Sequence, residues 1–148
     1  MTPVQPLRKR RRMADAGGVY EARTGAVLVR VAPSYLPEQS DPLDGKFVWA
    51  YVVEIENHGD EPLTLMSRRW VITDAQNRVE IVEGDGVVGE QPRLAPREAF
   101  RYASGCPLNT SSGAMRGTYA MLADDGRSFE VEIPEFSLHL PGAAKTLN

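Results

Sequence analysis

Hydrophobic and polar residues alternate along most of the chain, and this period of two is typical of β-strands that bury one face. The longest run covers residues 46–57, where aromatic and β-branched residues from Phe47 to Ile55 occupy alternate positions. Most positions between them are also apolar, which indicates a central strand covered on both faces. Glu54 and Glu56 lie near the end of this run, and we expect them to face solvent.

Shorter runs predict further strands over residues 26–32, 63–74, 78–83, 98–103, 115–123, 127–133 and 136–140. Clusters of Gly, Pro and polar residues separate these runs and predict loops over residues 33–45, 84–96 and 104–113. Within the second run, Trp70 and Ile72 share one face, and we expect Arg68-Arg69 to be a solvated or edge charge pair. Asp124-Asp125-Gly126 is a strong turn signal that predicts a hairpin.

No segment shows a convincing helical period, and 11 prolines and 13 glycines fit many turns better than helices. The spacing of the runs predicts an all-β fold of about seven to nine strands. We expect an immunoglobulin-like or fibronectin type III-like β-sandwich of two antiparallel sheets over residues 19–141. Residues 1–18 are predicted to be a flexible basic tail, and residues 142–148 a short C-terminal tail.

The formal net charge of −3 hides an uneven distribution. Five consecutive residues, Arg8, Lys9, Arg10, Arg11 and Arg12, are basic, and the rest of the chain has 12 basic against 20 acidic residues. An acidic surface repels phosphate backbones, so we expect nucleic-acid binding only non-specifically, through these five residues. A solvated terminus is the more usual role of such a run.

The remaining composition narrows the class of protein further. A single cysteine, Cys106, excludes an internal disulfide, and no apolar stretch is long enough to span a membrane. The first residues lack the apolar core of a signal peptide. We therefore expect a cytoplasmic protein that is a monomer or a dimer.

Gly84-Asp85-Gly86-Val87-Val88-Gly89 matches the G-x-G-x-x-G pattern that binds pyrophosphate in dinucleotide-binding folds. Those folds require a helix after the third glycine, whereas Pro92 and Pro96 follow here. Two interpretations remain open: glycines that take positive φ in a connecting loop, or amides that form an anion-binding nest. The candidate anion-binding residues are Gly84, Gly86, Gly89, Arg93 and Arg97.

Candidate catalytic or metal-binding residues are sparse. His58 and His139 are isolated, and Cys106 has no Cys or His neighbour at ligand spacing. No nucleophile lies near a base in the sequence. We therefore predict no catalytic residues, no metal site, no cofactor and no enzymatic activity, and we expect the alternating aromatic residues to be core.

An ordered series of short motifs resembles the ApaG protein family over about residues 19 to 141. The motifs of this series are the 84–92 loop, the runs 47–57 and 68–74, and the later residues Leu94, Pro96, Phe100, Tyr102, Ser104-Gly105, Leu108, Thr110, Gly113, Met115, Gly117, Tyr119, Met121 and Pro134-Glu135-Phe136. One departure is Pro96-Arg97-Glu98, where the family usually has Pro-Gly-Glu. This change is expected to affect a turn and adds a positive charge.

The resemblance implies a fibronectin type III-like sandwich and a genetic link to cobalt resistance and magnesium efflux. With so few ligand clusters, we expect that link to be indirect. Related domains of F-box and polymerase-interacting proteins imply a protein-interaction role, and this is our leading hypothesis. The alternative is binding of pyrophosphate or a polyphosphate nucleotide at Gly84–Gly89. The resemblance supports this alternative because genes of the family often lie near the gene for a diadenosine polyphosphate hydrolase.

Overall fold

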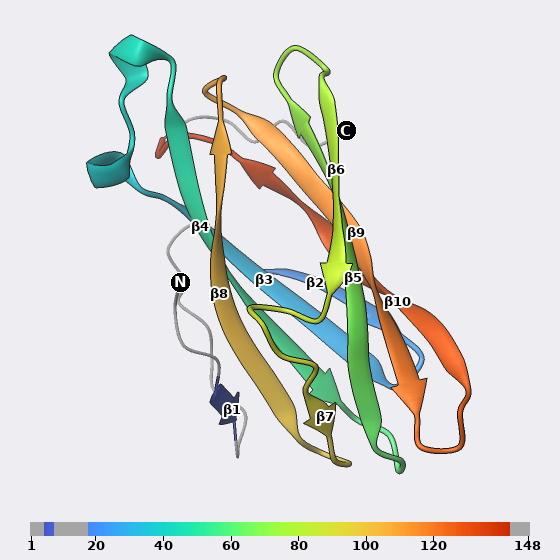
Figure 1. The fold of residues 1–148 in the computed structure, drawn as a ribbon. Helices are drawn as coiled ribbons and strands as arrows, with labels where there is room; N and C mark the ends of the chain where they lie inside the picture. The colour runs from blue at the N-terminus through green and yellow to red at the C-terminus, as the bar shows by residue number, and fades with distance from the viewer. Residues whose placement is uncertain (1–4, 8–17, 143–148) are drawn as a thin grey trace.

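The computed structural model describes residues 5–7 and 18–142, and it consists of two antiparallel β-sheets packed face to face (Figure 1). One sheet has the order β1-β8-β4-β3-β2, and the other has the order β10-β9-β5-β6 with β7 paired to β5. The predicted all-β sandwich is therefore confirmed. The predicted tails lie almost wholly outside the described residues. The strands are β1 Gln5–Leu7, β2 Tyr20–Thr24, β3 Val27–Tyr35, β4 Phe47–Asn57, β5 Leu63–Asp74, β6 Val79–Asp85, β7 Arg93–Leu94, β8 Ala99–Leu108, β9 Gly113–Ala123 and β10 Ser128–Leu138.

The irregular segments are short among the described residues. Two 3₁₀ helices, η1 Pro37–Gln39 and η2 Pro42–Asp44, lie in the predicted 33–45 loop. The part of the chain that the structure describes contains no helix with the length and apolar character needed to cross a membrane.

Several of the predicted boundaries are wrong, mainly where Pro or Gly lies within a strand. β3 continues through Pro33 to Tyr35, which were predicted to belong to a loop, because it pairs with β4 along its whole length. β8 continues to Leu108, because it pairs with β4 along its whole length despite Gly105 and Pro107. β10 joins the two predicted strands into one, because a register shift between Ile133 and Phe136 absorbs the proline between them. Pairing to a neighbouring strand thus overrides a local loop signal.

The core lies between the two inner faces, and its centre is aromatic. The indole ring of Trp70 makes edge contacts with the rings of Tyr51, Tyr119 and Phe136, at centroid distances of 5.3, 6.5 and 5.9 Å. Edge-to-face pairs of this kind contribute about 0.5–1.5 kcal/mol each beyond the area they bury. The alternating aromatic residues are therefore core residues, as predicted from the sequence.

A β-bulge in β5 changes which side chains face the core. Leu65 is opposite Met121 and Ser67 is opposite Ala120, so Met66 has no partner on β9. One extra residue shifts the alternation of all that follow. As a result Arg68, Trp70 and Ile72 share the inner face of the sheet with Leu63 and Leu65. The expectation that Arg68 and Arg69 form a solvated pair is wrong for Arg68, which turns inward.

The edge strand β6 presents its residues in the reverse of the usual amphipathic order. Val79 and Ile81 face outward and are 58% and 51% exposed, whereas Glu80 is opposite Ile72 on the inner side. A charged side chain that points inward from an edge strand discourages edge-to-edge aggregation. It also places a carboxylate at the opening between the two sheets.

The outer face of the first sheet carries a row of ionic side chains. Arg30 of β3 donates hydrogen bonds to Glu21 of β2 and to Glu54 and Glu56 of β4, at 2.5, 3.2 and 2.6 Å. Glu54 is fully buried and Glu56 nearly so, and the expectation that they face solvent is wrong. Burial and the neighbouring Glu56 raise the pKa of Glu54, and Arg30 opposes that rise.

We expect Arg30→Met to lower the free energy of unfolding by about 3–5 kcal/mol. The substitution removes the guanidinium that donates to Glu54 and leaves that buried carboxylate without a cation. The exposed Arg23 on the adjacent strand is the matched control, and Arg23→Met should cost about 0.5 kcal/mol or less. Urea unfolding followed by tryptophan fluorescence measures both. Equal effects of the two substitutions would contradict a special role for Arg30.

The turn at residues 95–98 is closed by a hydrogen bond, and arginine occupies the position at which the related motif has glycine. Arg97 has a φ of 71°, and the N–H of Glu98 donates to the carbonyl of Ala95 at 3.0 Å. Proline followed by a left-handed residue is the pattern of a type II turn. The Arg97 guanidinium donates to the carbonyls of His58 and Gly59 at 2.6 and 2.7 Å. These bonds offset part of the cost of a left-handed arginine.

We expect Arg97→Gly to be more stable than Arg97→Ala by about 1 kcal/mol. Both variants lose the guanidinium bonds, but only alanine keeps a Cβ at the left-handed φ. Thermal and urea unfolding of the two variants measure the difference. Equal stability, or a more stable alanine variant, would show that this position carries no backbone strain.

Candidate functional site

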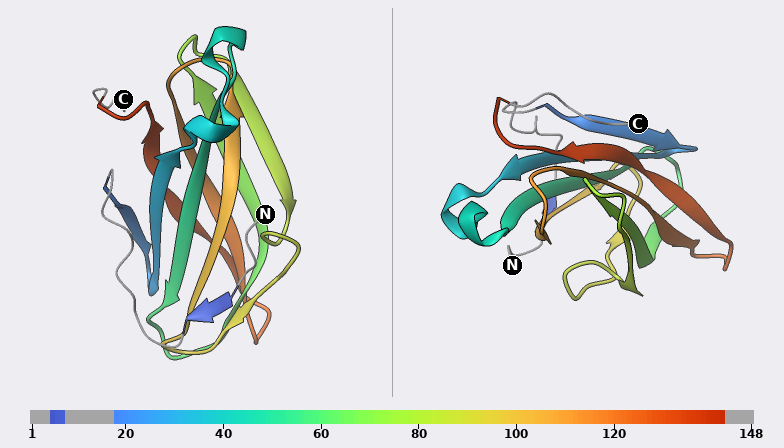
Figure 2. Two further views of the ribbon diagram at one scale, coloured as in Figure 1. Left: turned by 90° about the vertical axis from the view of Figure 1, so that its left-hand side faces the viewer. Right: turned by 90° about the horizontal axis from the view of Figure 1, so that it is seen from above.

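Along one side of the sandwich, β8 of one sheet lies across from β6 of the other (Figure 2). A cavity of about 630 Å³ lies there, and we call it the β6–β8 groove. Its lining is drawn from both sheets and from the segment that follows β6: Tyr51, Arg68, Trp70, Ile72, Glu80, Val82, Asp85, Val87, Val88, Gly89, Tyr102, Ser104, Gly105, Cys106, Pro107 and Met115. This volume is within the range of small-molecule sites.

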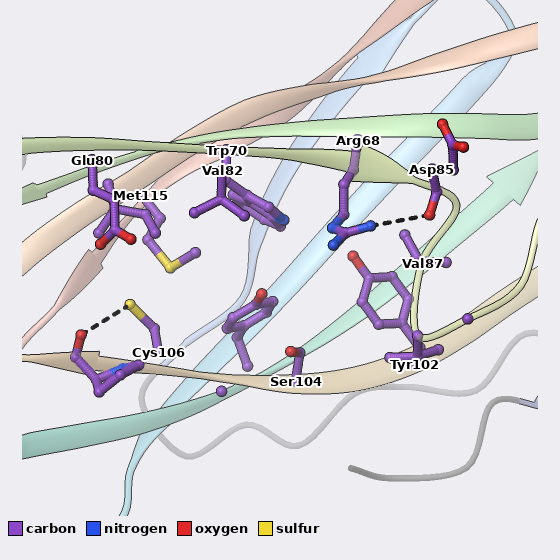
Figure 3. A pocket seen from close by; sticks show the side chains of 16 residues that line it. Arg68, Trp70, Glu80, Val82, Asp85, Val87, Tyr102, Ser104, Cys106 and Met115 are labelled. Atoms are coloured by element: carbon purple, nitrogen blue, oxygen red, sulfur yellow. Dashed lines mark hydrogen bonds between the residues drawn. The ribbon is translucent and has the colours of Figure 1, made fainter.

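Side chains from the two sheets face one another across the groove (Figure 3). Arg68, Trp70 and Val82 project from β5 and β6, and Tyr102, Ser104 and Cys106 project from β8. The alternation along β8 explains the second set, because every second residue from Tyr102 onward faces inward. Both polar and apolar groups therefore line the same space.

The G-x-G-x-x-G segment closes one end of the groove, and β5 holds it in place. The bulge leaves the carbonyl of Met66 free to accept the N–H of Gly86 at 2.8 Å and the side-chain amide of Gln91 at 2.9 Å. The Nη1 of Arg68 donates to the carbonyls of Asp85 and Gly86 at 3.1 and 2.9 Å. The bulge thus fixes the loop in two ways. It frees the Met66 carbonyl to accept from the loop, and it turns Arg68 inward to donate to the loop carbonyls.

Each glycine of the segment has a local structural role. A Cβ at Gly84 would lie 2.9 Å from the Arg68 guanidinium, which occupies the space above it. Gly86 has a φ of 62°, and a Cβ there would lie 2.1 Å from the carbonyl oxygen of Glu90. Gly89 has a φ of 84° in a tight turn. Any substitution of Gly86 therefore distorts the loop, whatever the loop binds.

The tight turn is formed by Val88 and Gly89, both at positive φ, between Val87 and Glu90. Val87 and Glu90 exchange N–H to carbonyl bonds at 2.8 and 2.9 Å, as in a type I′ turn. Val88 has a φ of 44°, which is rare and strained for a β-branched residue. Its side chain packs against the core and lines the groove, so strain is stored at the groove's edge.

Arg68 brings a positive charge near two phenols that line the groove, Tyr51 and Tyr102, and near the buried Tyr119 behind them. Figure 3 shows the hydroxyl of Tyr102 pointing toward the Arg68 guanidinium. The Tyr102 hydroxyl also bonds to that of Tyr119, and both side chains are buried. Burial raises the pKa of Tyr51, Tyr102 and Tyr119 above the ordinary value. All three phenols therefore stay protonated at neutral pH and keep a proton to donate.

The opposite end of the groove is acidic and apolar. Glu80 projects toward Met115 and Cys106 (Figure 3). Burial, and then the charge of Glu80, raise the pKa of the Cys106 thiol to about 12. The thiolate is the reactive form of cysteine, so this thiol is poorly suited to nucleophilic chemistry.

The structure places the two predicted loop arginines in other contacts. Arg93 pairs with Asp124 at 2.5 Å, and Arg97 bonds to the 58–60 turn. The amides of Gly86, Val87 and Glu90 already donate to carbonyls. Of the predicted anion-binding residues, the three glycines thus lie together, with the guanidinium of Arg68 beside them.

Metal ligands do not gather among residues 18–142, where no cluster of three or more His, Cys, Asp or Glu side chains is suited to a metal ion. His58 hydrogen-bonds to Glu56 at 2.8 Å, and His139 to Ser137 at 3.1 Å. Neither imidazole lines the groove.

Sequence reasoning missed Arg68, Glu80 and Ser104 as groove residues. A signal for Arg68 exists, because the apolar positions of β5 change from odd at Leu63 and Leu65 to even at Trp70 and Ile72. That change of parity is the mark of a bulge. Glu80 carries no comparable signal, since Val79 and Ile81 beside it read as the buried positions.

We expect the Cys106 thiol to react with iodoacetamide at pH 8 about 1000-fold more slowly in the folded protein than in the urea-unfolded chain. Since the folded pKa exceeds the unfolded one, the thiol also lowers stability as pH rises from about 9 toward 12. Mass spectrometry measures alkylation, and Cys106→Ala is the control for other sites. Comparable rates in the two states would contradict a protonated, enclosed thiol.

Comparison with known proteins assigns the chain to a family. The profile of the ApaG domain matches residues 37–123. The Protein ApaG of Caulobacter vibrioides is 63% identical over 94% of this chain and 99% of its own length, and that of Sinorhizobium fredii is 51% identical over 88% and 100%. The crystal structure of the putative ApaA protein from Bordetella pertussis, 52% identical, superposes with a TM-score of 0.77 over 79% of this chain and 95% of its own. The fold, the loop and these relatives agree, and the chain belongs to the ApaG family.

Proposed function

We propose that this chain is a non-enzymatic binding module that takes an extended segment of a partner protein at the β6–β8 groove. The observation that carries the proposal is the edge of β8 beside the groove, most of which pairs with no second strand among the described residues. β1 pairs only with Ala99–Arg101, so among the described residues the remainder of β8 pairs with β4 on one side alone. An uncovered edge offers backbone groups to an added strand.

The groove gives such a segment both support and selectivity. A strand added beside β8 directs alternate side chains toward the groove. There they meet the apolar surfaces of Trp70, Val82 and Met115 and the polar groups of Arg68 and Ser104. Pro107 lacks an amide donor and sets a limit to pairing at one end of the edge.

A binding role fits the chemistry of the groove better than catalysis. Cys106 is held as a thiol, and Ser104 has no imidazole near it among the groove residues. The histidines bond to Glu56 and Ser137 instead. We therefore propose recognition rather than turnover, and we propose that the link to cobalt and magnesium operates through the partner.

Binding of pyrophosphate or a polyphosphate nucleotide at Gly84–Gly89 is the second candidate, and Arg68 is the observation that favours it. Against it, Asp85 and Glu90 carry negative charge within the same segment. Several loop amides are also occupied by internal bonds. A polyanion would meet one guanidinium and two nearby carboxylates, which is weak complementarity.

The groove proposal is tested by Glu80→Arg, with the adjacent Ile81→Arg as the matched control. Both side chains are exposed, but only the first points into the groove. The immobilised wild-type protein and each variant are used to capture proteins from a native extract, with quantification by mass spectrometry. We expect proteins enriched by wild type to be retained by Ile81→Arg and reduced about 10-fold or more with Glu80→Arg.

Two outcomes would overturn the proposal. One is that wild type enriches no protein specifically. The other is that Ile81→Arg abolishes capture while Glu80→Arg preserves it, which would move the interface to the outer face of β6.

A further inference from the structure

Arg68 carries its charge into the groove and donates there to main-chain carbonyls. Within residues 18–142 its guanidinium forms no ion pair with Asp or Glu, whereas Arg69, the next residue, pairs with Glu83 at 3.3 Å on the outer face. The partners of the Arg68 Nη1 are the main-chain carbonyls of Asp85 and Gly86, which carry no full charge. A half-buried cation of this kind is better satisfied when a ligand supplies an anionic oxygen.

We propose that Arg68 binds the free C-terminal carboxylate of the partner segment, so that the groove recognises the last residues of a protein chain. This inference rests on the proposed function and narrows it from an internal segment to a chain end. Capture of a terminal carboxylate is an established mode of peptide recognition, in which an anion anchors one end of an extended chain.

The charges around the groove favour a carboxylate over a phosphate. The Arg68 guanidinium balances one negative charge of a ligand. The groove is also lined by two acidic residues, Asp85 and Glu80, which disfavour any further negative charge. A phosphate dianion leaves one charge without a partner near these carboxylates, and a polyphosphate leaves more. A carboxylate monoanion also fits the planar fork of the guanidinium, which donates two parallel hydrogen bonds.

Neutral donors accompany the cation. The Tyr102 hydroxyl points toward Arg68 (Figure 3), and Tyr51 and Ser104 also line the groove. Because these hydroxyls remain protonated, they add donors without adding negative charge. When the Tyr119 hydroxyl donates to that of Tyr102, the Tyr102 proton is left as a second donor for a carboxylate at Arg68.

The negative charge of Glu80, at the end of the groove away from Arg68, predicts which residue precedes the C-terminus of the bound segment. In the pairing of β5 with β6, Arg68 is opposite Gly84 and Ile72 is opposite Glu80, so the two charged side chains are four residues apart along β5. Four residues of extended chain span roughly 13 Å. We therefore expect an apolar last residue and a lysine or arginine about four positions before it, facing Glu80.

The test compares two pools of N-acetylated hexapeptides that differ only at the terminus, one with free carboxylates and one with C-terminal amides. Each pool is incubated with the full chain, and retained peptides are identified by mass spectrometry. We expect retention from the free-acid pool to exceed that from the amide pool by roughly 10- to 100-fold. This comparison uses the unaltered protein, so it does not depend on whether a variant folds.

Adjacent arginines supply the matched substitutions. Arg68→Gln should abolish the preference for the free acid, and Arg69→Gln should preserve it. Because Arg68 also holds the loop, the circular dichroism and unfolding midpoint of both variants are measured alongside. Inorganic phosphate, titrated against labelled wild-type protein by NMR, is the competing anion.

The outcomes separate this inference from the proposed function. If free acids and amides are retained equally and Glu80→Arg blocks the retention of both, the carboxylate inference is overturned. The proposed binding of an extended segment is then left in place. If peptides from neither pool are retained, both the carboxylate inference and the proposed binding of short extended segments are overturned. Saturable shifts with phosphate, but none with the acid peptides, overturn the inference in favour of the anion candidate.

Discussion

The extra residue at Met66 is the constraint on which the groove depends. It shifts the alternation of β5, and the shift turns Arg68 toward the core side while Arg69 remains outside. The same bulge frees the Met66 carbonyl, which then accepts the N–H of Gly86. Without the bulge, the arginine and the loop would have no common anchor.

This arrangement changes the meaning of the G-x-G-x-x-G segment. Its glycines are explained by contacts within the chain: space for a guanidinium at Gly84, close approach of the Glu90 carbonyl at Gly86, and a left-handed turn at Gly89. The segment is then the closed end of a groove, and the polar chemistry comes from β5. A sequence motif shared with nucleotide-binding folds is here satisfied by a different structural need.

Most of the fold follows from alternation alone, since β4 and β5 are long and their periodicity is regular. Alternation fails where backbone pairing overrides local signals, as at Gly105 and Pro107 in β8, which continue a strand because β4 lies alongside. It also fails at Glu80, because an edge strand can invert its faces. The groove therefore combines one residue that a parity change predicts, Arg68, with others that only the tertiary structure reveals.

Arg30 and Arg68 have different roles because their partners differ. Arg30 is enclosed by carboxylates and stabilises the outer face of its sheet. Arg68 has main-chain carbonyls for partners among the described residues and faces a cavity lined by neutral donors and apolar rings. In the first network the cation is paired with carboxylates, although the buried Oε2 of Glu54 has no hydrogen-bond partner among the described residues. The second leaves a charge that a ligand can complete.

The most direct test of the central claim is the position of the Arg68 side chain in solution. In uniformly ¹⁵N-labelled protein, the Hε of Arg68 is assigned and its nuclear Overhauser contacts are recorded. An inward guanidinium predicts contacts with the ring protons of Tyr102 and the amide of Val87. Contacts with Thr118 and Glu130 on the outer face, or fast exchange with water and no contact to any ring, would contradict the account.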